Sequence, residues 1–185
     1  MDKMTGTQRY GSLWWLRPAL IAVAAAVLLN LFVCRIAVVS GSSMYPTLRD
    51  GDVLLIRILN YSPEQGDILV CPADPNGALA GQQVVKRCIA TEGRTVFIDY
   101  ASNTISVDGM KLDEPYINLS EDDPLESGGR ENAIYLVPQG YVFVMGDNRN
   151  YSADSRDGVV GMVPVEKILG GMMLHIPVGR WFGQK

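Results

Sequence analysis

The chain has 185 residues, 48% of them hydrophobic, and a formal net charge of −4. This length suits one globular domain with an appendage, and the acidic balance argues against a nucleic-acid partner, because binding phosphates requires a clustered basic face. The cysteines Cys34, Cys71 and Cys88 lack the close spacing of metal-ligand pairs. We therefore expect no metal and no cofactor, and none of these thiols is expected to be catalytic.

An apolar run at residues 18–34 is the first predicted element. Trp14 and Trp15 precede it, and a membrane-spanning helix needs about 20 apolar residues, so the run and its flanks predict a single transmembrane helix. Basic residues dominate the segment ahead of it, which places the N-terminus in the cytoplasm by the positive-inside rule. We expect residues 1–36 to form a cytoplasmic N-terminus with a cell-membrane anchor, and residues 37–185 to form an extracytoplasmic domain.

A cleaved signal peptide is the alternative interpretation of the same segment. A basic start and an apolar core are followed by small residues near Ser40, as such peptides require. The core is long for a signal peptide, however, and Arg35 lies between it and the cleavage position. The anchor is favoured, and a mature chain that begins at Gly41 in an intact-mass measurement would rule it out.

Short runs rich in β-branched and aromatic residues follow the apolar segment, and turn residues separate them. This pattern predicts an antiparallel all-β domain, with hairpins at residues 99–103, 107–109 and 137–140. The predicted strands are residues 53–56, 67–71, 84–89, 95–98, 104–107, 133–137, 141–145 and 159–163.

Ser43 is the candidate nucleophile, because it lies directly after the apolar run, in the sequence Gly41-Ser42-Ser43-Met44-Tyr45-Pro46-Thr47-Leu48. A serine hydroxyl is a poor nucleophile at neutral pH and needs a nearby base to take its proton. The chain has one histidine, His175, in an apolar strand-like run where a packed structural role is favoured. A lysine is the remaining candidate for the base.

Lys86 interrupts the strand-like run 84–90. Because strand side chains alternate between faces, Val84, Lys86 and Cys88 share one face, and that face is mostly apolar. Burial in such a face lowers the pKa of an amine and allows it to act as a base near neutral pH. Taken alone, Lys86 also fits an edge lysine that points to solvent and protects the sheet from aggregation.

The third segment with chemical groups is Gly146 to Arg156, which follows the predicted strand 141–145. It is rich in Asp, Asn, Gly and Ser, whose side chains bond to nearby backbone groups and favour turns. On composition alone this segment is a surface loop.

Taken together, these segments resemble the type I signal peptidases, the membrane-bound Ser-Lys proteases that remove signal peptides from exported proteins. Residues 43–48 are similar to the nucleophile box, residues 65–70 to the strand box that follows, Lys86-Arg87 to the lysine box and residues 146–156 to the closing box. The resemblance extends over about residues 36–165. It implies a signal-peptidase-like β-fold, signal peptides of exported preproteins as substrates, and the lipid bilayer and nearby export machinery as partners.

The resemblance also implies a role for each matching residue. Ser43 attacks the scissile carbonyl, neutral Lys86 accepts its proton, and Ser152 orients the lysine. The backbone N–H of Ser43 would stabilise the oxyanion, while Gly41 stands where some relatives have a second donor, as in the short Gram-positive-type enzymes. Site support is implied for Gly146, for the pair Arg87 and Asp147, and for the pair Asp154 and Arg156. Substrate contacts are expected at Met44, Ile68 and Val84.

Two other functions compete with this interpretation. A self-cleaving transcriptional repressor would need a DNA-binding helix-turn-helix module where this chain has an apolar segment. A membrane-tethered domain that binds peptides by strand addition would have no need of a lysine on an apolar strand face. The joint presence of Ser43, Lys86 and Ser152 favours the enzyme.

Overall fold

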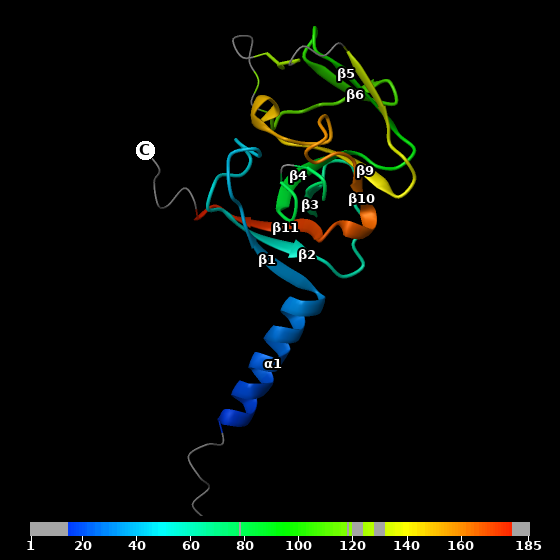
Figure 1. Ribbon diagram of the computed structural model, residues 1–185. Coiled ribbons are helices and arrows are strands. Elements are labelled where there is room, and N and C mark those ends of the chain that lie inside the picture. Colours follow the sequence, from blue (N-terminus) through cyan, green and yellow to red (C-terminus); the bar gives the residue numbers. More distant parts are fainter. Residues whose placement is uncertain (1–14, 78, 118, 120–123, 128–131, 179–185) are drawn as a thin grey trace, which may run out of the picture.

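The computed structural model describes residues 15–77, 79–117, 119, 124–127 and 132–178. A single α-helix in these ranges, α1 (Leu16–Phe32), projects from a body made of β-strands (Figure 1). The strands are β1 (Cys34–Val38), β2 (Val53–Arg57), β3 (Ile68–Pro72), β4 (Gln83–Ala90), β5 (Thr95–Asp99), β6 (Thr104–Val107), β7 (Met110–Lys111), β8 (Ala133–Leu136), β9 (Tyr141–Met145), β10 (Val163–Pro164) and β11 (Gly170–Ile176).

The strands form two sheets. The larger sheet has seven strands in the order β1-β2-β11-β3-β4-β9-β10, and the smaller has four in the order β7-β6-β5-β8. Every strand pairing within the described ranges is antiparallel. The smaller sheet lies at the end of the body away from α1 (Figure 1). The prediction of a mostly antiparallel β-fold with one helix is therefore confirmed.

The predicted transmembrane crossing is not shown. The helix α1 has 17 residues, and within the described ranges no helix combines the length and apolarity that a membrane crossing requires. Trp14, which the sequence analysis counted with this segment, lies outside the described residues. The apolar run also ends in a strand rather than in helix, because residues from Cys34 onward pair with β2.

Two local predictions are wrong. The predicted strand at residues 159–163 is reduced to β10, because Val159 and Gly161 donate backbone N–H groups to Asp157 in a turn. The turn at residues 137–140 does not close a hairpin, because β8 pairs with β5 in the smaller sheet whereas β9 pairs with β4 and β10 in the larger one. That turn links the two sheets.

Three buried hydrophobic clusters hold the sheets together, and one of them fixes the nucleophile loop. Met44 and Leu48, which are 1% and 0% exposed, pack in this cluster with Leu54 and Ile56 of β2. Each such burial contributes about 1.5–3 kcal/mol relative to an exposed side chain. The loop that carries Ser43 is thus tied at two points to the larger sheet.

Candidate active site

Ser43 lies in the loop between β1 and β2, and its hydroxyl meets the amine of a lysine from β4. Lys86 Nζ donates a hydrogen bond of 2.7 Å to Ser43 Oγ. The two residues are 43 positions apart in the sequence, so the antiparallel pairing of the larger sheet brings them together. The distance allows direct proton transfer from the hydroxyl to a neutral amine.

The surroundings of Lys86 favour that neutral amine. Lys86 is 3% exposed, and its cross-strand neighbour on β3 is the fully buried Leu69. Burial of the amine lowers the pKa of Lys86, and the nearby Asp154 carboxylate opposes this shift. Cys88, on the same face of β4, is fully buried, as the strand alternation predicted. The lysine is therefore a buried residue of β4 and not a solvent-exposed edge lysine.

The buried cysteines Cys71 and Cys88 favour the protonated thiol. Burial raises the pKa of the Cys71 and Cys88 thiols to about 12. Both thiols are free, as is that of Cys34. Protonated thiols in these positions behave as small apolar side chains.

The segment that follows β9 closes over the backbone of Ser43. Asn148 donates its backbone N–H to the Ser43 carbonyl (3.0 Å) and its side-chain amide to the Ser42 carbonyl (3.1 Å). Thr47 Oγ1 donates to Asp147 Oδ2 at 2.5 Å. Three successive hydrogen bonds thus hold the nucleophile loop against residues 147–148, and Thr47 and Asn148 are contacts that the sequence analysis missed.

Gly146 makes the closest approach to this backbone. A Cβ atom at Gly146 would lie 2.6 Å from Ser152 Cβ, and still closer to Ser152 Oγ and the Ser43 carbonyl oxygen. Real Cβ atoms do not approach other heavy atoms so closely. Glycine at this position is required by space, because the segment touches both serines at once.

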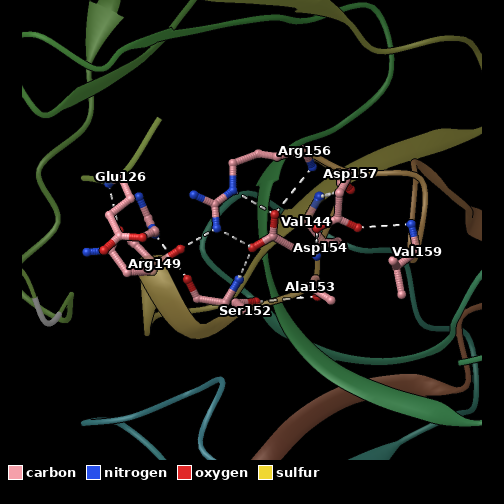
Figure 2. Close-up of polar contacts among 12 residues, drawn as sticks. Glu126, Val144, Arg149, Ser152, Ala153, Asp154, Arg156, Asp157 and Val159 are labelled. Carbon is pink, nitrogen blue, oxygen red and sulfur yellow. Dashed lines mark hydrogen bonds and ion pairs between the residues drawn. The ribbon is translucent and has the colours of Figure 1, made fainter. Parts of the chain in front are cut away.

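Ser152 lies beside this contact. Its hydroxyl donates to the Ala153 carbonyl at 3.4 Å (Figure 2). Within the described residues no hydrogen bond joins Ser152 to Lys86. The lysine-orienting role implied by the resemblance stays a prediction.

Two buried ion pairs flank the site. Arg87 donates from Nε and Nη2 to both oxygens of Asp147, at 2.8 and 2.7 Å, and the two side chains are 11% and 0% exposed. Arg156 contacts both oxygens of Asp154 at 2.8 and 2.9 Å, and these side chains are 4% and 0% exposed. Neither pair is an ordinary surface pair, because removing one partner would leave a buried charge unpaired.

The Asp154 carboxylate also ties the closing segment back to the site. It accepts the backbone N–H of Gly146 at 3.1 Å. Figure 2 shows Arg156 between this carboxylate and the Arg149 carbonyl, to which it donates a hydrogen bond of 2.5 Å. The segment that composition alone predicted to be a surface loop therefore forms a densely bonded wall of the site, in which Tyr151 is exposed but Asp147 and Asp154 are fully buried.

Ser43 and Lys86 open onto a groove of about 280 Å³. Residues 38–40 and residues 82–85 of the β4 region line the groove. Of the expected substrate contacts, Met44 and Val84 line the groove. Ile68 is not among the residues that line the groove and packs in the same buried cluster as Met44.

His175 does not take part in the site. Its Nε2 lies 2.7 Å from Asp52 Oδ2, and Asp52 is fully buried. The histidine belongs to β11, in agreement with the strand position that the sequence predicted. Within the described residues no group of His, Cys, Asp and Glu side chains has the arrangement of a metal site.

Sequence reasoning missed a second layer around the site. Glu114 forms an ion pair with Arg149, and Tyr116 lies under the guanidinium of Arg87. Residues 113–116 carry no local signal for these contacts, because their partners are about 30 residues away on either side.

Comparisons with known proteins agree with the motifs. The chain matches the family model described as signal peptidase, peptidase S26, over residues 12–176. It is 37% identical over 162 residues to the signal peptidase I of Bacillus amyloliquefaciens, which covers 84% of this chain and 80% of that protein. It is 37% identical over 181 residues to signal peptidase I T of Bacillus subtilis (strain 168), with 91% and 90% covered.

A solved signal peptidase I from Enterococcus faecalis V583 shares 29% sequence identity with the chain, covering 60% of it and 97% of that structure with a TM-score of 0.49. The family match spans nearly the whole chain, and the identities to curated relatives extend over most of both partners. The chain therefore belongs to the signal peptidase family, peptidase S26, and is an enzyme of the signal peptidase I type.

Proposed function

We propose that this enzyme is a membrane-bound serine endopeptidase that removes signal peptides from exported preproteins with a Ser43–Lys86 dyad, cutting after small residues. The observation that carries the proposal is the 2.7 Å contact between Lys86 Nζ and Ser43 Oγ in a buried setting. Membership of the signal peptidase family supplies the substrate class.

In the first half-reaction, neutral Lys86 takes the hydroxyl proton as Ser43 Oγ bonds to the scissile carbonyl carbon. The negative charge that develops on the carbonyl oxygen is stabilised by the backbone N–H of Ser43. Lys86 then returns the proton to the leaving amine, the C–N bond breaks, and the signal peptide remains as an ester on Ser43. Hydrolysis repeats the same steps, with water attacking and Ser43 leaving.

The residues around the dyad act through it. Gly146 allows close approach to Ser43, and Ser152 orients the amine. The two ion pairs, Arg87 with Asp147 and Asp154 with Arg156, brace the wall that holds these groups. Such bracing matters because small errors in the position of reacting groups are costly to rate.

The substrate would lie extended in the groove between residues 38–40 and 82–85. Met44 and Val84 line this groove and would contact the residues before the cleaved bond, while Ile68 supports Met44 from the core. A groove of about 280 Å³ suits small side chains at those positions. A preference of the Ala-x-Ala kind follows from the family resemblance.

Membrane attachment is supported by exposed apolar side chains on α1. Leu20, Ile21, Val23 and Val27 are 66%, 69%, 61% and 50% exposed. Side chains of this kind favour lipid over water. We assign residues 1–36 to a cytoplasmic N-terminus and anchor and residues 37–185 to the extracytoplasmic protease domain, near the export machinery that delivers its substrates.

A second apolar surface continues from α1 onto the larger sheet. Ile36 and Leu174 are 64% and 53% exposed and both lie opposite Leu55 in the sheet, so they share one face with it.

Exchanging Ile36 and Leu174 together for glutamine is expected to weaken binding of a chain lacking residues 1–32 to phospholipid vesicles by about 10-fold. Co-sedimentation with vesicles measures this change in affinity. Met110→Gln, at an equally exposed site on the distant β7, serves as the control and should change nothing.

The pH dependence of cleavage tests the lysine base. Burial lowers the pKa of Lys86, so the neutral, active amine forms at lower pH than for an ordinary lysine, whose pKa is about 10.4. As pH rises through the lowered pKa the lysine loses its proton, so kcat/KM rises. Rates on a signal-peptide substrate measured across pH would show this rising limb. A profile that peaks below about pH 6 would contradict a lysine base.

A further inference from the structure

Glu114 and Tyr116, which follow the smaller sheet's strand β7, contact two arginines that flank the active site. Glu114 lies just after β7, yet both of its carboxylate oxygens accept hydrogen bonds from Arg149, from Nη2 at 2.6 Å and from Nη1 at 3.1 Å. The side chains of Glu114 and Arg149 are 7% and 1% exposed. Such a forked, buried pair fixes the guanidinium in one orientation.

Arg149 passes this orientation to the active site. Its Nε donates to the Gly146 carbonyl at 3.0 Å. Gly146 is the residue whose backbone lies against the Ser43 carbonyl oxygen and Ser152. A displacement of Arg149 therefore moves the peptide group that faces the nucleophile.

Tyr116 makes the corresponding contact on the lysine side. Its ring centroid lies 3.8 Å from the guanidinium carbon of Arg87, the residue after Lys86. The Tyr116 hydroxyl donates to Glu114 Oε1 at 3.1 Å. Arg87 in turn pairs with Asp147, the residue after Gly146. The contacts form a closed ring that includes the chain neighbours of both Lys86 and Gly146.

We propose that Glu114 and Tyr116 are positioning residues for peptide cleavage, holding the Lys86 strand and the Gly146 segment at the separation that Ser43 needs. This inference rests on the proposed Ser43–Lys86 mechanism. A displacement of about 1 Å in a catalytic group costs about 100-fold in rate, so a contact that fixes this separation acts on kcat. The smaller sheet would then contribute to catalysis, because Glu114 and Tyr116 follow its strand β7 in the sequence.

A positioning role and a merely structural role predict different results. Replacing a buried ion pair by apolar residues of similar size is often neutral or stabilising. The variant Glu114→Leu with Arg149→Met therefore keeps the interior filled, but it removes the guanidinium that binds the Gly146 carbonyl. The segment Gly146 to Arg156 then loses a contact that fixes its position while the protein stays folded, and we expect water to reach Lys86.

The experiment uses the full chain in detergent with a signal-peptide substrate, and rates are normalised to folded protein. We expect the double variant to keep an unfolding midpoint near that of the wild type, with kcat lowered about 10- to 100-fold and KM changed less than about 2-fold. The rising limb of the pH profile moves to higher pH, because hydration of Lys86 removes the burial that lowers its pKa. Tyr116→Leu shifts kcat and the pH limb in the same directions.

Arg94→Gln is the matched control, since it removes an ion pair of the same smaller sheet whose side chains are 48% and 36% exposed. It should leave kcat and the pH limb unchanged. The proposal is overturned if the double variant behaves like Arg94→Gln, or if its loss follows the unfolded fraction alone. The wild type and Ser43→Ala are measured in the same assay. Equal cleavage rates in these two would show that the Ser43–Lys86 mechanism itself is wrong, which is a different result from a failure of the positioning proposal.

Discussion

Replacement of Lys86 by alanine is expected to lower kcat for signal-peptide cleavage by about 10⁴-fold or more, as loss of a base acting with a serine does elsewhere. The reason is local: Lys86 Nζ is the group that contacts Ser43 Oγ, at 2.7 Å. Ser43→Ala should lose as much, and the double variant no more than either, because the two side chains act as one unit. Steady-state cleavage of a preprotein with an Ala-x-Ala site measures all three.

The fold should survive these changes, which makes the loss interpretable. Lys86→Met keeps the length of the side chain and removes an amine that burial keeps from charging easily. Lys167→Ala, at an exposed lysine of the 3₁₀ turn η2 (Val165–Lys167), is the control and should retain full activity. If Lys86→Ala remained active while His175→Ala did not, the base would be the histidine and the dyad would be wrong.

The sequence could predict Lys86 as the base only from several segments together. Alternation along β4 places Lys86 between Val84 and Cys88, but this local pattern also fits an edge lysine in solvent, and the resemblance carried by the other segments favoured a buried base. The rejection of His175 as the base came from its own segment, because its apolar strand position was visible without knowledge of Asp52. Short-range periodicity carried this prediction, whereas the prediction of Lys86 needed the other motifs.

The errors arise where pairing between distant segments decides the structure. Residues 137–140 have the chemistry of a tight turn, and Gly140 has a φ of 76°, yet the flanking strands join different sheets. Apart from Arg35, residues 34–38 are apolar and can either continue a helix or form a strand, and hydrogen bonds to β2 decide for the strand. Neither choice is encoded within the segment itself.

The second layer of the site was missed for the same reason. Glu114 reaches Arg149 across 35 positions, and the contact of Tyr116 with Arg87 depends on how the smaller sheet meets the larger one. Composition alone assigned residues 146–156 to the surface, although Asp147 and Asp154 are fully buried. Charged residues are buried only when paired, and their partners belong to other parts of the chain.

Gly146→Ala is the second substitution with a large expected effect. A methyl group there would overlap Ser152 Oγ and the Ser43 carbonyl oxygen, so the nucleophile loop or the closing segment must move. We expect kcat to fall about 100-fold, because displacement of the nucleophile by about 1 Å has that cost. Overpacking should also lower the free energy of unfolding by about 1–3 kcal/mol. Gly158→Ala, where an added methyl would meet nothing within 4 Å, should change neither quantity.

The overlap has two parts, and Ser152→Gly separates them. This change removes the side chain that a methyl at Gly146 would strike, but leaves the Ser43 carbonyl oxygen in place. In a double-mutant cycle of unfolding free energies, Gly146→Ala should therefore cost about 1 kcal/mol less in the Ser152→Gly background than in the wild type. A cost that is equal in both backgrounds would place the whole strain on Ser43. The loss of kcat would then come from displacement of the nucleophile's own backbone, and Ser152 would have no part in it.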